Sequence, residues 1–318
     1  MLQNALNTFL FAFNITAPIF VMLFLGIWLK KRSMINDEFI KSASQLVYNI
    51  GLPVMLFITS ATTDLSHITD WNLLIAFGLM TVLVFIGSLL TAHWHCKDPR
   101  DHGVFIQGAF RGNLVILGLA FCANAYGEKG LALASLPVAM TVVLYNVLSV
   151  YVLNRSLHHA SNSFMPTLIG IVKNPLIIAI FAGFAVNAIN LTPPNLVMDS
   201  GKYLSQMVLP LALICIGGSL SMERLTRIDT TTLSACLWKL ILSPIIACTI
   251  AIGFGLRGDA LAILFLLAAS PTATISFVMV QAMKGNGELA ANIVAQTTLW
   301  SLITVTLGLW VLQIMNFV

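Results

Sequence analysis

The chain has 318 residues, of which 58% are hydrophobic and only 9% are charged, with a formal net charge of +4. A soluble domain needs about a quarter charged residues to cover its surface, so this composition excludes soluble enzymes and binding domains and indicates a polytopic membrane protein. No run of basic residues points to a nucleic-acid partner.

Ten apolar segments follow one another along the chain, each about long enough to cross the roughly 30 Å of hydrocarbon in a bilayer. The predicted spans are residues 8–29, 38–60, 71–95, 103–125, 130–154, 166–190, 200–222, 231–255, 259–283 and 289–315. The connections are short, so no separate soluble domain is expected. The first span is too long for the apolar core of a signal peptide, and we expect it to be retained.

Lysine and arginine are concentrated on one side of the predicted spans. Those that follow odd-numbered spans are Lys30, Lys31, Arg32, Lys41, Lys97, Arg100, Arg155, Arg224, Arg227 and Lys284. The opposite side holds only Lys129, Lys202 and Arg257. Because cytoplasmic loops carry the excess of basic residues, both termini are expected outside the cell.

The two halves of the chain repeat their helix-breaking residues at a fixed offset of 157 positions. The matching pairs are Pro18 with Pro175, Gly26 with Gly183, and Pro53 with Pro210. Each half holds an odd number of spans, so the second half would cross the membrane in the opposite sense, as in many secondary transporters. We therefore predict an all-α integral membrane fold of ten transmembrane helices, built as two inverted five-helix repeats, residues 1–157 and 158–318. A duplication kept only for packing is the alternative.

The same offset places Asn113 of "FRGNLVIL" opposite Ser270 of "ASPTATIS". Pro271 removes a helical hydrogen bond, while Gly112 weakens the helix and Asn113 competes with its backbone bonds. Irregular backbone at this depth persists only when it is buried in protein or lines a wet cavity. We therefore predict that spans four and nine are broken and cross near the midplane. Each break would expose a helix N-terminus, which favours an anion.

Arg111 lies about 12 Å inside span four, counted at about 1.5 Å per residue, and no acidic residue lies deep in any predicted span. An arginine at this depth costs at least a few kcal/mol unless it is paired or hydrated. Its guanidinium matches a carboxylate bidentately, so an anionic substrate is its natural complement. The alternatives are snorkelling to the cytoplasmic interface and bonding to carbonyls of the break. The lack of deep acids argues against cation exchange, but coupling to H+ or Na+ stays open.

The remaining candidate substrate-binding residues are polar or helix-breaking residues near the two predicted breaks and on the cavity wall. They are Asn49, Pro53, Gly112, Asn113, Leu114, Asn146, Ser270, Pro271, Thr272, Thr274, Ser276 and Gln296. The polar ones among them could instead satisfy backbone groups freed by the breaks. Lys173 and Lys239 lie near cytoplasmic span ends and are expected to snorkel. The histidines of "HWHC" (93–96) and His158-His159 lack a nearby carboxylate, so no metal site and no cofactor are predicted.

Taken together, the sequence resembles the auxin efflux carrier family, which includes plant auxin carriers and bacterial malate and malonate permeases. The resemblance rests on "LVYNIGLPVMLF" (46–57), "RGNLVILGLAFCANAYGEKG" (111–130) and "SPTATISFV" (270–278), and it covers nearly the whole chain. It implies a fold related to bile-acid symporters and sodium/proton antiporters. Spans 1, 2, 6 and 7 would form a scaffold, and spans 3–5 and 8–10 a transport bundle. Elevator-type movement and homodimers through the scaffold would follow, in a bacterial cytoplasmic membrane.

Two departures from the plant carriers bear on the substrate. Gly112 stands where they have a proline before the crossover asparagine, and the connection between spans five and six is only residues 155–164. A small mono- or dicarboxylate such as malate or malonate, rather than auxin, is therefore expected. The alternatives are a membrane receptor or sensor for a carboxylate, which would need a signalling domain or long tails, and an intramembrane enzyme, which would need a deep metal-binding or Ser–His cluster. The sequence contains neither feature.

Overall fold

The computed structural model describes residues 2–62, 71–157, 175–189, 191, 193–220 and 229–318. In these ranges the regular structure is helical, apart from an isolated antiparallel bridge between Gly112 and Thr272. The all-α fold class is therefore confirmed for the part of the chain that the structure describes. The predicted features that fall outside these ranges include parts of predicted spans six and seven, the repeat boundary at residue 158, His158, His159, Lys173, Arg224 and Arg227.

Thirteen α-helices make up the described fold. They are α1 (Leu2–Lys31), α2 (Asp37–Leu46), α3 (Leu52–Thr62), α4 (Trp71–His95), α5 (His102–Phe110), α6 (Leu119–Ser156), α8 (Pro175–Ala188), α9 (Asn195–Ser219), α11 (Thr230–Leu237), α12 (Ser243–Gly253), α13 (Gly258–Ala268), α14 (Thr274–Ala282) and α15 (Gly287–Ile314). Short π-helical turns join some of them: η1 (Val47–Gly51), η4 (Leu114–Gly118) and η5 (Trp238–Leu242). Through these turns α2 continues into α3, and α11 into α12.

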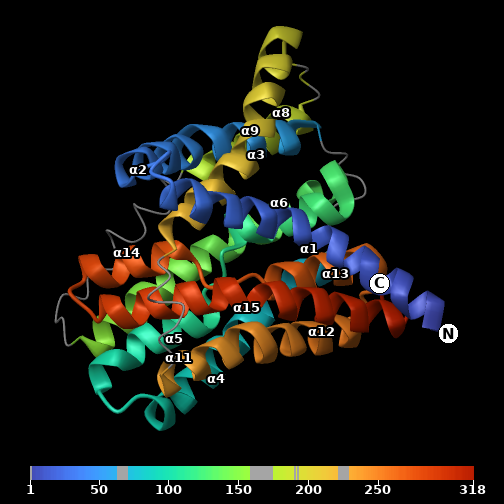
Figure 1. The fold of residues 1–318 in the computed structure, drawn as a ribbon. Coiled ribbons are helices and arrows are strands. Elements are labelled where there is room, and N and C mark those ends of the chain that lie inside the picture. Colours follow the sequence, from blue (N-terminus) through green and yellow to red (C-terminus); the bar gives the residue numbers. More distant parts are fainter. Residues whose placement is uncertain (1, 63–70, 158–174, 190, 192, 221–228) are drawn as a thin grey trace.

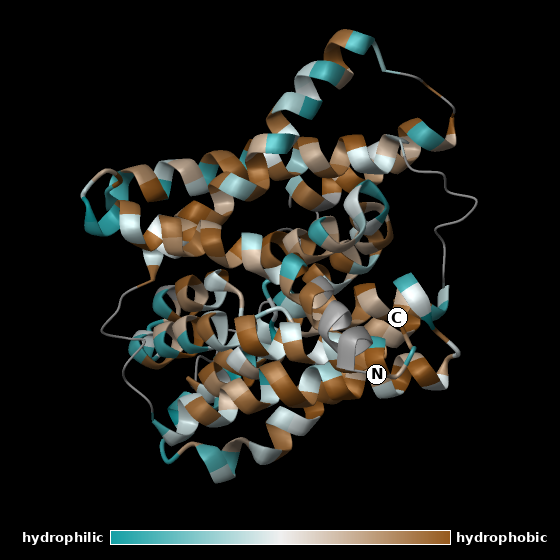
Figure 2. Cartoon of the chain, turned by 45° about the vertical axis from the view of Figure 1, so that its right-hand side comes forward, coloured by the Kyte–Doolittle hydropathy of each residue, from teal (hydrophilic) through white to brown (hydrophobic). Residues whose placement is uncertain are grey.

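The helices form two groups, which Figure 1 shows from the side. The pairs α2–α3 and α8–α9 lie in one group, and α4, α5 and α11 to α15 lie in the other, with α1 and α6 between them. Figure 2 shows hydrophobic residues along the flanks of the helices and hydrophilic residues gathered at many of the connections. Large apolar side chains such as Leu90, Leu196 and Phe181 are exposed on these flanks, as expected of surfaces that face lipid.

Seven helical stretches are long and apolar enough to cross a membrane, counted over the described residues. They are Ala12–Lys31, Asp37–Thr62, Trp71–His95, Leu114–Ser156, Asn195–Ser219, Thr230–Gly253 and Gly287–Ile314. Predicted spans 103–125, 166–190 and 259–283 do not appear as separate helices of this length. The first and third are interrupted, and residues 166–174 of the second lie outside the described part.

The 43-residue stretch Leu114–Ser156 holds two helical parts rather than one straight helix. Gly127 lies between them with φ 57° and ψ −139°, a conformation that glycine adopts without the steric penalty of a Cβ. The chain therefore changes direction there, between the end of predicted span 103–125 and the start of predicted span 130–154.

Close backbone contacts between α1 and α9, and between α8 and α3, depend on glycine. A Cβ on Gly26 would collide with the carbonyl oxygen of Ile214, and a Cβ on Gly183 would collide with that of Phe57. Gly183 follows Gly26, and Ile214 follows Phe57, at the same offset of 157 positions. The two helix pairs thus use matching residues of the two halves for the same kind of contact.

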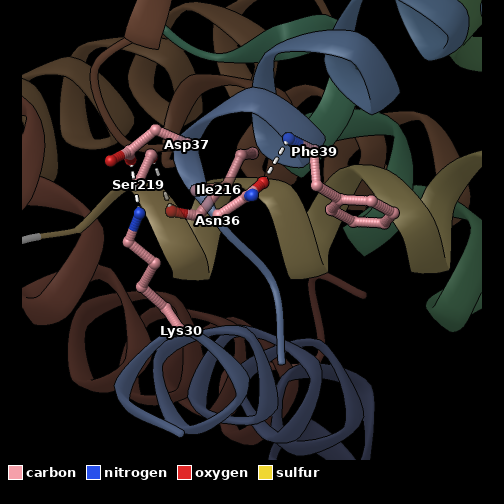
Figure 3. A network of polar contacts seen from close by, with 6 residues as sticks. All are labelled: Lys30, Asn36, Asp37, Phe39, Ile216 and Ser219. Carbon is pink, nitrogen blue, oxygen red and sulfur yellow. Dashed lines mark hydrogen bonds and ion pairs between the residues drawn. The ribbon is translucent and has the colours of Figure 1, made fainter. Parts of the chain in front are cut away.

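The turn between α1 and α2 is built by local polar contacts, drawn in Figure 3. Asn36 is the N-cap of α2 and accepts a hydrogen bond from the backbone N–H of Phe39 at 2.8 Å. Asp37 follows in the first turn, where the helix dipole stabilises a negative charge, and it forms an ion pair with Lys30 at the end of α1. Ser219 closes the adjoining end of α9 by donating to a carbonyl of its own last turn. One ion pair and two side-chain hydrogen bonds therefore stabilise this end of the helices.

An aromatic cluster fixes the end of α5 inside the larger group of helices. The ring of Phe110 packs edge-on against Phe85 of α4 at 5.4 Å and against Tyr145 of α6 at 5.5 Å between centroids. Phe110 is 2% exposed and is the last residue of α5. The backbone that follows is thus held in the buried interior, where the interruption of the helix begins.

Candidate functional site at two joined helix breaks

The first break separates α5 from η4 and consists of Arg111, Gly112 and Asn113. Arg111 still closes the last turn of α5, since its N–H donates to the carbonyl of Gln107 at 3.0 Å, but its ψ of 95° takes the backbone out of the helix. The carbonyl of Asn113 then accepts from Gly118 at 2.9 Å. Three residues therefore leave the helical conformation between two helical segments.

The second break separates α13 from α14 and covers Ala269 to Ala273. Ser270 folds its hydroxyl back onto the carbonyl of Leu267 at 2.7 Å, which satisfies an acceptor at the end of α13. Pro271 follows and has no N–H with which to continue the helix. Both interruptions lie at the residues where the sequence predicts them.

The two breaks are hydrogen-bonded to each other. Asn113 N–H donates to the carbonyl of Pro271 at 2.6 Å, and Ala273 N–H donates to the carbonyl of Arg111 at 3.0 Å. The hydroxyl of Thr272 reaches past this bridge to the carbonyl of Gly108 in α5 at 2.7 Å. These backbone groups are buried, so each break supplies partners that the other break would otherwise lack.

Gly112 stands at the closest approach of the two breaks. A Cβ on this residue would lie 2.7 Å from the hydroxyl of Ser270 and 3.0 Å from the Nζ atom of Lys239. A residue with a side chain would displace the hydroxyl of Ser270 and the Nζ atom of Lys239, so glycine at this position permits the close approach of the two breaks.

Arg111 is 5% exposed and directs its guanidinium at α6. One terminal nitrogen donates to the carbonyl of Tyr145 at 3.2 Å and to the hydroxyl of Ser149 at 2.9 Å. The other donates to the amide oxygen of Asn146 at 2.7 Å. The side chain therefore ties the first break to α6, and it makes no ion pair with a carboxylate in the described part of the chain.

Lys239 is a functional candidate that the sequence interpretation misplaces. It is 0% exposed, and its Nζ donates to the carbonyl of Ala268 at 2.8 Å, so the expected snorkelling to the interface is wrong. The residue sits in the π-helical turn η5, and its side chain reaches the end of α13 beside Gly112. Counting residues from a span end does not predict the direction of a side chain in a π-turn.

The other candidates divide into residues at the breaks and residues without a contact to them. Asn146 binds Arg111, Leu114 and Ser276 are buried, and Thr274 is half-buried at the start of α14. Gln296 is buried and accepts from the indole N–H of Trp300 at 3.0 Å. The side chain of Asn49 is exposed, and Pro53 is half-buried; neither side chain is hydrogen-bonded to a break within the described ranges.

The site also contains polar residues that the sequence does not predict as candidates. Tyr145 and Ser149 lie one helical turn apart on the face of α6 that receives Arg111. Thr297 of α15 accepts from the backbone N–H of Thr272 at 3.1 Å. The spacing of Tyr145 and Ser149 is a signal in the sequence, but it has meaning only when the position of Arg111 is known.

Acidic residues stay away from the breaks in the described part of the chain. They lie in connections, near helix ends or beside Gly127. Asp101 is an example: burial raises the pKa of its carboxyl, and a hydrogen bond from Asn286 opposes that shift. Within the described ranges no three His, Cys, Asp or Glu side chains are grouped as they would be to hold a metal ion.

A cavity of about 890 Å³ lies between α1, α3 and α9 on one side and α6 on the other. Its polar lining includes Asn124, Ser205 and Gln206, and the charged residues Glu128, Lys129 and Lys202 also line it. The side chain of Asn124 donates to a carbonyl of α1 at 2.9 Å. Because Ala120 of α6 also lines the cavity, the helix that leaves the first break runs directly along its wall.

Known proteins resemble this chain over nearly its whole length. A family model described as "Membrane transport protein" matches residues 11–309. An uncharacterized transporter of Methanocaldococcus jannaschii is 25% identical over 311 residues, which cover 94% of this chain and 98% of the relative. A protein of Rhizobium meliloti described as a "Putative malonate transporter" is 26% identical over 307 residues, covering 92% of this chain and 93% of the relative.

Proposed function

Because the chain belongs to the membrane transport protein family, the auxin efflux carrier family, we propose that it carries a small organic anion across the membrane, a mono- or dicarboxylate such as malate or malonate. The family and the relatives are transporters and not enzymes, which removes the intramembrane enzyme from the alternatives. Malonate is favoured as a first substrate to test because one relative carries that description.

The buried guanidinium of Arg111 is the observation that carries this proposal. Arginine has five N–H donors, and three hydrogen bonds to α6 occupy part of them. No ion pair neutralises it among the described residues, and an uncompensated buried charge is costly. A carboxylate that reaches the break would supply the missing negative charge.

The cavity beside α6 supports a route to this site. It has amide and hydroxyl groups that hydrogen-bond carboxylates, and its charged lining residues are Glu128, Lys129 and Lys202. We assign the cavity to substrate approach and Gly112, Asn113, Ser270 and Thr272 at the breaks to the binding site near Arg111.

We further propose ten transmembrane helices in two inverted repeats, with crossed broken helices 4 and 9. The matched contacts of Gly26 and Gly183 support this repeat, as does the hydrogen bonding between the two breaks. The cavity is bordered by α1, α3 and α9 and also by α6, which supports elevator-type movement of a transport bundle against a scaffold. We place the protein in a bacterial cytoplasmic membrane with both termini outside, as a homodimer through its scaffold.

The proposal is tested with purified protein in liposomes. A thermal-shift screen of mono- and dicarboxylates first selects ligands, and uptake of the radiolabelled form of each stabilising compound is then measured. We expect saturable uptake of at least one of them. Binding without any uptake would instead favour the alternative, a receptor or sensor for a carboxylate.

Substitution of Arg111 by alanine should lower uptake by about tenfold or more, since a hydrogen bond to a charged group is lost. The matched control is Arg100→Ala, which removes an exposed arginine outside the breaks. Size-exclusion elution of both variants reports their folding. If folded Arg111→Ala transports as fast as the unaltered protein, the anion site is not at Arg111.

A further inference from the structure

The ammonium group of Lys239 lies against both helix breaks. It donates to the carbonyl of Ala268, the last residue of α13, at 2.8 Å. On its other side it approaches Gly112, where a Cβ would come within 3.0 Å of it. Its complete burial leaves it no access to water in this conformation. The terminal nitrogen of a lysine from a third helix therefore lies where the two breaks meet.

The carboxyl end of a half-helix is a natural place for a cation. Unpaired carbonyl oxygens there carry partial negative charge, and transporters with broken helices hold coupling ions at such ends. At the end of α13 the carbonyl oxygen of Ala268 already accepts a hydrogen bond from Lys239, and the hydroxyl of Ser243 lies 3.5 Å from the same oxygen. Lys239 thus occupies the oxygen at which a coupling ion would bind.

Carbonyl oxygens in the last turns of α13 and α5 also accept hydrogen bonds from side chains. The hydroxyl of Ser270 satisfies Leu267, and the hydroxyl of Thr272 satisfies Gly108 at the end of α5. No acidic residue of the described part lies beside the breaks to attract a second cation. A sodium ion at this place would meet the repulsion of the ammonium and find its oxygen ligands already bonded.

We propose that Lys239 is a cation built into the transport site, where its ammonium takes the place of a coupling sodium ion at the end of α13. This inference rests on the proposed transport function and answers the question of sodium coupling that the sequence leaves open. Carboxylate uptake should then proceed without Na+. Removal of the ammonium should expose oxygen ligands that bind Na+.

The first experiment measures unfolding midpoints of purified protein in sodium chloride and in choline chloride, without substrate. We expect equal midpoints for the unaltered protein and a higher midpoint in sodium chloride for Lys239→Ala. Lys239→Arg keeps a cation and should respond like the unaltered protein, as should Lys41→Ala, which removes an exposed lysine of α2. Stabilisation of the unaltered protein by Na+, or the same indifference in Lys239→Ala, would overturn the proposal.

The second experiment measures carboxylate uptake into liposomes with either salt on both sides. The unaltered protein should transport at the same rate in both, and Lys239→Ala should lose about tenfold in choline, because a buried carbonyl loses its partner. A requirement of the unaltered protein for Na+ overturns the inference even if Lys239→Ala does not fold. Absence of any carboxylate uptake contradicts the proposed function instead, and the midpoints in the two salts still test the role of Lys239.

Discussion

The two helix breaks both interrupt a helix with non-helical backbone, but they contain different residues. The break after α5 has no proline and carries an arginine, whereas the break after α13 contains Pro271 between two hydroxyl residues. Each contributes one N–H and one carbonyl to the bridge, through Asn113 and Arg111 in the first and Ala273 and Pro271 in the second. The difference teaches that the bridge, rather than a particular helix breaker, holds both backbones.

The breaks also differ in how a cation reaches them. Arg111 belongs to the first break itself and turns away to α6, so its charge is fastened to a neighbouring helix. Lys239 comes from outside the second break and points into it, onto the carbonyl of Ala268. One cation thus braces its own break against the bundle, and the other supports a break from a separate helix.

The largest effect in this comparison is expected at the contact that both breaks share. Gly112→Ala places a Cβ against the hydroxyl of Ser270 and the Nζ atom of Lys239. Both side chains must then shift from the carbonyls that they bond, so uptake and thermal stability should both fall. Gly78→Ala is the matched control, because a Cβ on Gly78 meets nothing within 4 Å and should leave both unchanged. Equal behaviour of the two variants would show that the close approach is not needed.

A smaller effect is expected from the hydroxyl that links the second break to α5. Thr272→Val keeps the shape but leaves the carbonyl of Gly108 without its partner, which should cost about 1–3 kcal/mol of stability. Denaturation midpoints measure the loss, and Thr272→Ser, which keeps the hydroxyl, should recover most of it. A valine variant as stable as the serine variant would contradict the role of this bond.

The smallest effect is expected at the proline. The carbonyl of Pro271 accepts from Asn113, and alanine would keep that carbonyl. We therefore expect Pro271→Ala to keep the break and most of the uptake, with a loss of about 0.4–1 kcal/mol from the freer unfolded chain. Pro99→Ala, outside the breaks, measures that contribution alone. A loss of uptake as large as that of Gly112→Ala would make the proline ring, and not the bridge, responsible for the second break.

Local chemistry makes much of this fold predictable. The apolar segments predict an all-helical membrane protein, and seven of the described stretches are long enough to span a membrane. Pro271 and the Gly112-Asn113 pair indicate where helices stop, because proline lacks a donor and glycine and asparagine disfavour helix. The number of helices is harder to predict, since α6 joins the end of predicted span 103–125 to the whole of span 130–154 across a kink at Gly127.

The sequence by itself determined that the chain is helical, belongs in a membrane and must interrupt two helices near buried polar residues. These features follow from the length of the apolar segments and from single residues, so they can be predicted without knowing which residues pack against them. Only the tertiary structure decided which groups satisfy the interrupted backbones. Lys239 meets Ala268, and Thr272 meets Gly108, across 29 and 164 positions of sequence. Such pairings depend on how the helices pack and on the direction each side chain takes, and no local pattern records either.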